Sequence, residues 1–205
     1  MIRNLIFDMG QVLMKWDPAY IAAQYTSTPE DAAAFMAELI VQPDWYLVDA
    51  GQVAEADYYA GLQKRASDKF RDALLTCYKE FEKHMPPLAD MHALANRAKE
   101  LGYGVYVLSN ALPRFEHVLK NCPTLKCIDD MVISAKEGMA KPDPRIYQLA
   151  LKKFGKPADE CVFIDDLQEN IDAAKAEGIH GIVFDGNVEK LIAALADLGV
   201  DLGTK

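Results

Sequence analysis

The chain has 205 residues, 51% of them hydrophobic and 26% charged, and a formal net charge of -9. This length and composition predict one core domain with room for an insertion, and they exclude a chain too polar to fold. The acidic balance argues against nucleic acid or an anionic membrane as the main partner, because phosphate backbones favour clustered Lys and Arg. A small phosphorylated ligand needs only a local patch of positive field, so it is compatible with this charge.

The N-terminal stretch MIRNLIFD is too short in its apolar part for a signal peptide, and no stretch of about 18 apolar residues follows that could span a bilayer. We therefore expect a cytoplasmic protein without a membrane partner. The four cysteines form no CxxC pair, and no histidine lies at a ligand-like spacing from them, so we expect reduced thiols rather than a zinc site. They are Cys77, Cys122, Cys127 and Cys161.

The first predicted element is a buried strand that ends at a charge. The apolar run NLI leads directly into FDMGQVL, residues 7–13, so that Asp8 stands where the hydrophobic pattern stops and Gly10 follows two residues later. A carboxylate at the end of a buried strand suggests a chemical role. Gly10, two residues later, raises the question of why this position holds glycine and not a second acid.

Residues 15–87 read as helices without a convincing strand. Four stretches rich in Ala, Glu and Lys repeat apolar residues at helical spacing. They are residues 17–25, 29–40, 52–66 and 69–85. More than seventy helical residues are too many for a simple crossover between two strands, so we predict a helical cap inserted into the core, with Pro86-Pro87 marking the return.

From residue 88 onward, apolar strand patterns alternate with helical ones. Such strands, separated by helices, indicate a parallel sheet covered on both faces. The sequence thus predicts an α/β fold, a doubly wound Rossmann-like core made of residues 1–14 and 88–205, with the helical cap at 15–87. The final stretch DLGVDLGTK is expected to be a loose tail.

Polar side chains follow several of the predicted strands. YGVYVLSN ends at Ser109 and Asn110, and ECVFIDD ends in Asp165 and Asp166. The turn after the strand MVISA carries Lys141, just before a helix that begins with PDPRIY. In open α/β sheets, ligands bind beyond the carboxyl ends of the strands, so we expect these groups to share one site with Asp8.

The residue types of this site point to metal-assisted chemistry. Asp8 and Asp166 held close together would repel each other unless one is protonated or a cation lies between them. Carboxylate ligands favour a hard ion, and Mg²⁺ commonly takes one or two carboxylates together with water and substrate phosphate. A carboxylate beside a metal ion and the Lys141 ammonium can act as a nucleophile and form an acyl phosphate. We therefore predict Asp8 as the attacking group.

The ordered set FDMGQV, VLSN, GMAKPDPRIY and VFIDDLQEN resembles motifs one to four of the haloacid dehalogenase (HAD) superfamily, in which residues 15–87 correspond to a C1-type cap. Within it, the chain is similar to sugar-phosphate phosphatases of the alpha-glucose-1-phosphate phosphatase type and to the phosphatase domain of soluble epoxide hydrolase. The resemblance implies a Mg²⁺-dependent phosphatase that acts on a small phosphorylated metabolite, of the sugar phosphate class, through an aspartyl-phosphate intermediate.

The resemblance also implies individual roles. Asp8, Ser109 and Lys141 would be catalytic, with Ser109, Asn110 and Lys141 holding the phosphoryl group. Asp8, Asp166 and the carbonyl of Gly10 would be the magnesium ligands. Asp165 and Asn170 would support that site without binding the ion directly; for Asn170, a solvent-facing position is the alternative.

Gly10 departs from the family pattern, in which most phosphatases have a second Asp that protonates the leaving group and then activates water. Such acid–base help is worth roughly 10²–10⁴ in rate. Three interpretations stay open. A phosphatase takes the proton from its substrate or from a cap residue, with Asp17, Asp44 and Asp49 as unranked candidates. A 2-haloacid dehalogenase needs no such proton. A non-catalytic or slow relative binds a phosphorylated metabolite or holds a phosphoaspartate as a signal.

The cap also contains aromatic residues that are candidates for a surface facing the site. Trp16 and the stretch PDWYLVDAGQ, residues 43–52, are the best placed, because a closing cap excludes water and contacts the substrate. Packing within the cap or against the core is the alternative explanation for Trp16, Trp45 and Tyr46.

Overall fold

A five-stranded parallel sheet forms the centre of the protein. The structure, a computed structural model, describes residues 1–203. The strands are ordered β3-β2-β1-β4-β5, and every neighbouring pair is parallel. Their bounds are β1 Asn4–Phe7, β2 Gly104–Ser109, β3 Asp130–Ile133, β4 Cys161–Asp165 and β5 His180–Val183. The predicted doubly wound α/β core is thereby confirmed.

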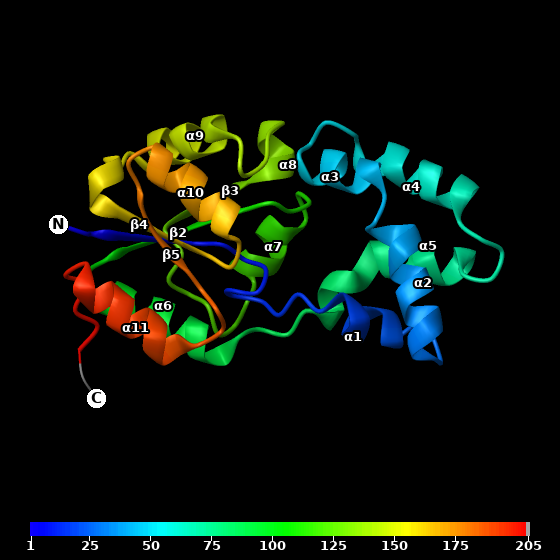
Figure 1. Cartoon of the computed structure of the whole chain (residues 1–205), viewed down its shortest axis with the longest axis horizontal. Coiled ribbons are helices and arrows are strands. Elements are labelled where there is room, and N and C mark those ends of the chain that lie inside the picture. Colours follow the sequence, from blue (N-terminus) through cyan, green and yellow to red (C-terminus); the bar gives the residue numbers. More distant parts are fainter. Residues whose placement is uncertain (204–205) are drawn as a thin grey trace.

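Helices cover both faces of the sheet, as a buried parallel sheet requires. Figure 1 shows α9 and α10 on one side and α6 and α11 on the other. Because strand side chains alternate, Leu5 and Phe7 pack with the second group while Ile6 packs with the first. The bounds of the core helices are α6 Ala89–Glu100, α7 Phe115–Lys120, α8 Ser134–Glu137, α9 Pro144–Phe154, η2 Ala158–Glu160, α10 Gln168–Ala176 and α11 Val188–Asp197.

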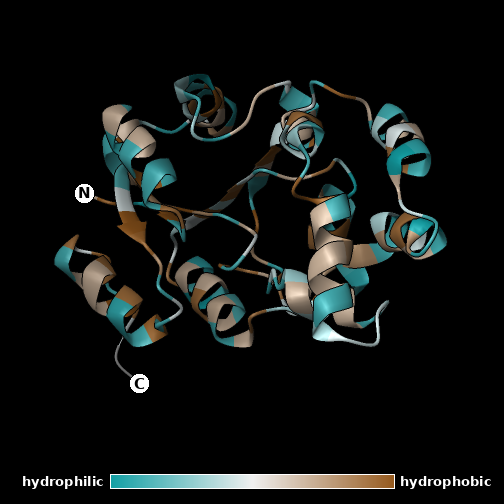
Figure 2. Cartoon of the chain, turned by 45° about the vertical axis from the view of Figure 1, so that its right-hand side comes forward, coloured by the Kyte–Doolittle hydropathy of each residue, from teal (hydrophilic) through white to brown (hydrophobic). Residues whose placement is uncertain are grey.

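Both ends of α9 carry residues that are typical of helix ends. The carboxylate of Asp143 accepts a hydrogen bond from the Arg145 N–H, Pro144 occupies the first turn, and Gly155 ends the helix in the left-handed region at φ 65°. These signals fix the start of α9 and therefore the position of the turn that carries Lys141. Figure 2 shows the hydrophilic and hydrophobic sides of the helices.

Between β1 and α6 the chain forms a set of helices that we call the helical insertion, residues 15–87. Its elements are α1 Pro18–Ala23, α2 Pro29–Leu39, α3 Pro43–Asp49, α4 Glu55–Arg65, α5 Arg71–Glu80 and η1 Phe81–His84. Four of these helices match the predicted ones. The helix α3 was not among the predicted helices, because seven residues with a single buried position, Val48, give no periodic pattern.

The helical insertion lies beyond the carboxyl ends of the strands. In Figure 1, β1 starts near the N label and runs toward α1, so the strand ends point at the insertion. The chain leaves and re-enters the core at one place, where the Lys15 N–H donates to the Pro86 carbonyl at 2.8 Å and the Leu88 N–H donates to the Leu13 carbonyl at 2.9 Å. In Figure 1, the C-terminal helix α11 lies at the end of the core that is away from the insertion.

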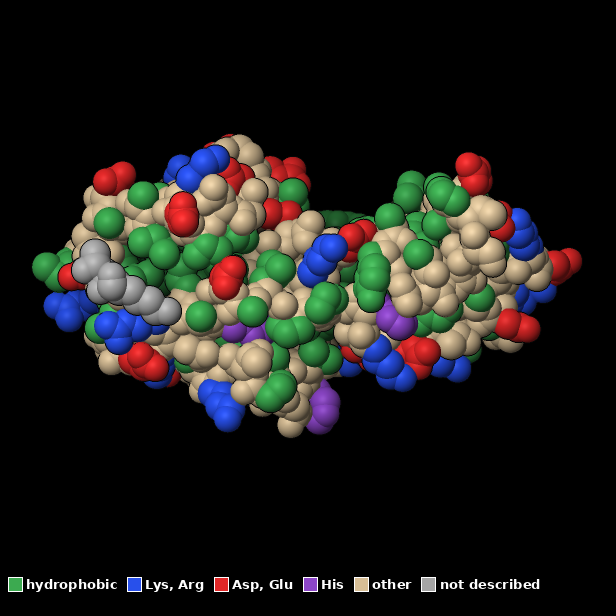
Figure 3. Space-filling model, turned by 90° about the horizontal axis from the view of Figure 1, so that it is seen from below, with side chains coloured by type: hydrophobic (Ala, Val, Ile, Leu, Met, Phe, Trp, Pro, Cys, Tyr) green, Lys and Arg blue, Asp and Glu red, His purple; other side chains and the backbone are tan. Residues whose placement is uncertain are grey.

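Three further expectations can be compared with the structure. Up to Gly203 the expected loose tail is packed rather than loose, since Val200 and Leu202 are buried; its last two residues lie outside the described part. All four cysteines are free thiols. Among residues 1–203, no helix combines the length and the apolar character needed to cross a bilayer. On the face shown in Figure 3, acidic and basic side chains are interspersed.

Candidate active site

A pocket of about 350 Å³ lies where the carboxyl ends of the strands meet the helical insertion. It brings together residues that are far apart in the sequence and that come from the ends of β1, β2 and β4 as well as from α3 and η1. Its lining residues are Asp8, Met9, Gly10, Gln11, Trp16, Trp45, Asp49, Phe81, Met85, Ser109, Asn110, Ala111, Phe115, Asp166 and Leu167. The predicted convergence of the strand ends is therefore present.

Asp8 is the first residue after β1, and its backbone is fixed by a hydrogen bond of 2.9 Å from its N–H to the carbonyl of Ile164 in β4. The residue is 9% exposed. Burial raises the pKa of the Asp8 carboxyl to about 6; the Lys141 ammonium opposes this rise and the negative charge of Asp165 adds to it.

The Lys141 ammonium lies between two carboxylates. Its Nζ is 2.9 Å from Asp8 Oδ1 and donates a hydrogen bond of 2.6 Å to Asp165 Oδ2. Burial lowers the pKa of Lys141, but the charges of Asp8 and Asp165 together raise it above the usual value, so the side chain stays charged. The contact with Asp8 lacks hydrogen-bond geometry, and Asp8 Oδ1 has no hydrogen-bond partner within residues 1–203.

Asp165 is fully buried and its oxygens are occupied by protein donors. Asp165 Oδ1 accepts from the Leu167 N–H at 2.8 Å, and the Asn170 amide donates to both carboxylate oxygens at 3.0 and 3.1 Å. Asn170 is itself buried, so the alternative of a solvent-facing side chain is wrong. Asn170 orients Asp165, which in turn holds Lys141.

The acidic residues of the pocket fit a divalent cation. One oxygen from each of Asp8, Asp165 and Asp166 can lie within 4.8 Å of the others. Three carboxylates and one ammonium leave two negative charges, which one divalent ion balances. Burial, and then the charge of Asp165, raises the pKa of Asp166 above its usual range, as expected for a carboxylate without a positive partner. The all-oxygen donor set suits Mg²⁺.

At the end of β2, the side chains of Ser109 and Asn110 have different surroundings. Ser109 is 1% exposed and lines the pocket. The Asn110 amide instead donates to the Lys141 carbonyl at 2.9 Å and accepts from the Lys141 N–H at 2.8 Å. The Asn110 side chain, which also lines the pocket, therefore fixes the backbone of Lys141, and its binding of phosphate stays a prediction. Sequence reasoning missed this role, because an Asn after a strand carries no signal of its distant partner.

Gly10 is not imposed by the backbone or by lack of space. Its φ is not in the left-handed region, and an added Cβ would meet only the Trp16 Cβ at an ordinary 3.8 Å. The neighbouring Gln11 does adopt a positive φ of 56°, and its side chain accepts from the Trp16 N–H at 3.2 Å. The missing second acid is thus a chemical property of this site rather than a steric one.

The helical insertion supplies an aromatic wall to the pocket. Trp16 stacks on Trp45 with ring centroids 6.4 Å apart, and Phe81 packs edge-on against Trp16 at 5.6 Å. Trp16 and Trp45 therefore both pack and face the site. Tyr46, by contrast, is 50% exposed and does not line the pocket.

Of the three candidate acids in the helical insertion, only Asp49 lines the pocket. Asp17 caps α1 and pairs with Lys15 at 3.0 Å, and Asp44 pairs with Arg65 at 2.9 Å. A sequence signal for Asp49 exists in hindsight, because it lies four residues after Trp45, which places both side chains on the same face of a helix.

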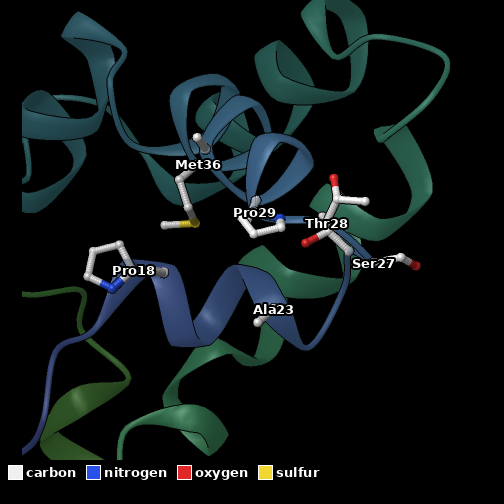
Figure 4. Close-up of a pocket in the computed structure, with 10 residues that line it drawn as sticks. Pro18, Ala23, Ser27, Thr28, Pro29 and Met36 are labelled. Atoms are coloured by element: carbon white, nitrogen blue, oxygen red, sulfur yellow. The ribbon is translucent and has the colours of Figure 1, made fainter.

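A second and larger hollow of about 620 Å³ lies within the helical insertion, between α1 and α2. Pro18, Ala23 and Met36 are among the residues around it (Figure 4). None of its lining residues is titratable, so this hollow offers no group for acid–base or metal chemistry.

A known protein family matches most of the chain. The model of the haloacid dehalogenase-like hydrolase family matches residues 2–178. The chain is a haloacid dehalogenase-like hydrolase. The superfamily expected from the four motifs is thus confirmed, and the protein is an enzyme of a hydrolase family.

Two curated relatives of this haloacid dehalogenase-like hydrolase span most of its length. The sesquiterpene phosphatase astK of Aspergillus oryzae is 30% identical over 181 residues, which cover 88% of each chain. The drimenol cyclase drtB of Aspergillus calidoustus is 29% identical over 90% of this chain, but the match covers only 34% of that longer protein.

Solved structures share the fold of this haloacid dehalogenase-like hydrolase. The HAD family enzyme bt-2542 of Bacteroides thetaiotaomicron, in complex with magnesium and inorganic phosphate, is 25% identical with a TM-score of 0.68, over 91% of this chain and 96% of that one. The L-2-haloacid dehalogenase PA0810 has a TM-score of 0.70 at 20% identity, over 89% and 84% of the two chains. The second likeness concerns the fold alone.

Proposed function

We propose that this hydrolase is a magnesium-dependent phosphomonoesterase that works through a phosphoaspartate at Asp8. The observation that carries the proposal is the Lys141 ammonium between Asp8 and Asp165, with Asp166 beside them at the edge of the pocket. A nucleophilic carboxylate needs nearby positive charge to approach a phosphate dianion, and this arrangement provides it on the protein side.

Asp8, Asp166 and the Gly10 carbonyl would hold Mg²⁺, which when bound supplies positive charge to the phosphoryl oxygens. In the first step, a carboxylate oxygen of Asp8 attacks phosphorus as the bond to the ester oxygen breaks. The Ser109 hydroxyl and the Lys141 ammonium hold the remaining phosphoryl oxygens during the transfer. In the second step, water attacks phosphorus and releases Asp8.

The helical insertion, residues 15–87, would act as a cap on the core formed by residues 1–14 and 88–205. Its aromatic wall of Trp16, Trp45 and Phe81 would exclude water from the phosphoryl group and contact the organic part of the substrate. A cytoplasmic location stays the prediction made from the sequence.

Relatives support the phosphatase proposal over its alternatives. Two relatives are named phosphatases, astK of Aspergillus oryzae and MT3486 of Mycobacterium tuberculosis. The related structure of bt-2542 contains magnesium and phosphate. A 2-haloacid dehalogenase is disfavoured, since Asp166 would add an unexplained negative charge beside a haloacid anion. Asp8 and Asp166 line one pocket, and the Lys141 ammonium lies 2.9 Å from Asp8; this arrangement favours an active enzyme over a protein that only binds phosphorylated metabolites.

The pocket wall bears on the organic part of the substrate. Resemblance to sugar phosphatases predicts a sugar phosphate, but the pocket wall favours an apolar group. Beyond the carboxylates, Ser109 and Asn110, the wall is made mostly of apolar side chains, and Gln11 is its polar exception. The name of astK, a sesquiterpene phosphatase, agrees with an apolar substrate.

A phosphatase assay tests the proposal. The purified protein is incubated with sugar phosphates and with isoprenoid monophosphates, with Mg²⁺ and with EDTA, beside Asp8→Asn. We expect phosphate release that needs Mg²⁺, disappears in D8N and has a higher kcat/KM for the apolar esters. Chloride release from 2-chloropropionate without metal would contradict the phosphatase, and a preference for sugar phosphates would restore the substrate class expected from the sequence.

A further inference from the structure

An acid–base group is missing from the catalytic edge of the sheet. Gly10 cannot transfer a proton, and Lys141, Asp8 and Asp166 have other proposed roles. Among the described residues that line the pocket, only Asp8, Asp49 and Asp166 are carboxylic acids. Asp8 is the proposed nucleophile and Asp166 a proposed cation ligand, so Asp49 is the one carboxyl of the pocket without a role.

The position of Asp49 is fixed by contacts with the core. It is the last residue of α3, and its carbonyl accepts a hydrogen bond from the buried Ser134 hydroxyl. The same hydroxyl accepts from the Ala111 N–H at 2.9 Å, directly after the β2 strand end. One side chain of the core thus links the backbone of Asp49 to the loop that follows Ser109.

The turn after α3 provides a second close contact between the insertion and the core. Gly51 adopts φ 67°, and a Cβ there would lie 2.2 Å from the Ala135 carbonyl oxygen. Backbone therefore lies against backbone two residues after Asp49. Because Ser134 and Gly51 hold the end of α3 at the core, the Asp49 carboxyl is a fixed part of the pocket wall.

The surroundings of Asp49 suit a group that both gives and takes a proton. Burial raises the pKa of its carboxyl to about 7; the Trp45 indole and the charge of Arg114 oppose the rise, and Glu55 adds to it. The Arg114 guanidinium is itself engaged by Glu55 at 3.1 Å and by Glu82 at 3.3 Å. A carboxyl that titrates near neutrality is present in both forms at working pH, as acid–base catalysis requires.

We propose that Asp49 supplies the proton transfers that Gly10 cannot, a role that rests on the proposed phosphatase function. As Asp8 attacks and the P–O bond to the organic group breaks, the Asp49 carboxyl gives its proton to the departing oxygen and an alcohol leaves. The Asp49 carboxylate then takes a proton from water as the water oxygen bonds to phosphorus. The bond from phosphorus to Asp8 breaks, phosphate leaves and both carboxyls return to their starting forms.

The test compares Asp49→Asn with Asp44→Asn, a control on the same helix whose carboxylate pairs with Arg65 away from the pocket. Two substrates separate the steps. An alkyl phosphate releases a poor leaving group that needs a proton, whereas p-nitrophenyl phosphate releases an acidic phenol that does not. Initial rates, the first turnover and phosphate bound to the acid-quenched protein are measured.

We expect D49N to lower kcat/KM for the alkyl phosphate by about 10²–10⁴, while D44N stays at the wild-type value. With p-nitrophenyl phosphate, D49N should release one phenol per active site and then stall with labelled phosphate on Asp8. Recovery of alkyl phosphate turnover in D49N by adding Gly10→Asp would support the same role, since a Cβ added at Gly10 makes only an ordinary contact.

The proposal is overturned if D49N hydrolyses the alkyl phosphate as fast as the wild type. It is also overturned if D49N loses both substrates equally without accumulating phosphoenzyme. Circular dichroism of D49N confirms that it is folded. A wild-type protein that releases no phosphate would instead overturn the proposed function, so the two failures are distinguishable.

Discussion

At the scale of single residues, the pocket combines groups that are stable only together. Lys141 is 2% exposed and would be costly to bury alone, and so would Asp165, which is 0% exposed. The Asn170 amide and the Leu167 N–H satisfy the carboxylate, and the Asn110 amide fixes the lysine backbone. A charge that is oriented by so many partners loses little energy in reorganisation when a phosphate binds.

Asp49 gives a prediction about stability that does not depend on activity. Its pKa of about 7 in the folded protein lies above the ordinary value of 3.8, so the folded state holds more protons than the unfolded state between about pH 4 and pH 7. The wild type should therefore lose stability relative to D49N as pH rises through this window. Urea unfolding of both proteins at several pH values measures the difference, and a difference that is constant with pH would contradict the raised pKa.

Some of these residues can be predicted from the sequence and others cannot. Asp8, Ser109, Lys141 and Asp166 follow strands or a strand–helix turn, and the parallel sheet brings such ends to one edge. The partner of Asn170 and the hydrogen bonds between Asn110 and the Lys141 backbone depend on contacts between distant segments, which local patterns do not contain.

At the scale of elements, the apolar runs and the helix caps predict nearly every strand and helix of the core, because each carries a strong periodic or capping signal. The helix α3 begins with Pro43, but it has no side-chain cap and only one buried position, so its periodic signal is absent. Its seven residues are held by tertiary contacts, namely the Ser134 hydroxyl and the close approach at Gly51. Elements that depend on their neighbours in this way cannot be recognised from their own residues.

The contact between α3 and α8 gives a prediction with a matched pair of glycines. Gly51 and Gly138 have similar positive φ values of 67° and 72°, but an added Cβ meets Ala135 only at Gly51. Gly138→Ala should cost about 1–2 kcal/mol, the price of a left-handed alanine. Gly51→Ala should cost more and should also lower kcat, because it displaces the end of α3. Urea unfolding measures the two costs, and equal values would contradict the steric argument.

At the scale of the whole molecule, negative charge gathers around a pocket in an acidic chain, so a bound cation should stabilise the fold. If Mg²⁺ binds only the folded state, a concentration one hundred times its Kd adds about 2.7 kcal/mol to the free energy of unfolding. Thermal unfolding with and without Mg²⁺ measures the increase in Tm.

Two variants sharpen this measurement. Asp166→Asn should remove most of the Mg²⁺-induced rise in Tm. Asp159→Asn, an exposed carboxylate of η2 at the opposite end of β4, should leave it unchanged. An equal rise in the wild type and in both variants would mean that the ion binds elsewhere on the acidic surface.

The paired crossing of the chain at Lys15–Pro86 and Leu13–Leu88 has a consequence for how such proteins diversify. Because both connections pass through one small antiparallel ladder, everything between them can be exchanged without moving a strand of the sheet. The core then keeps the carboxyl ends of its strands, while a different insertion provides a different pocket wall and a different proton donor. A different insertion between these two crossings would therefore change the specificity of the pocket, while the two backbone hydrogen bonds at the junction stay the same.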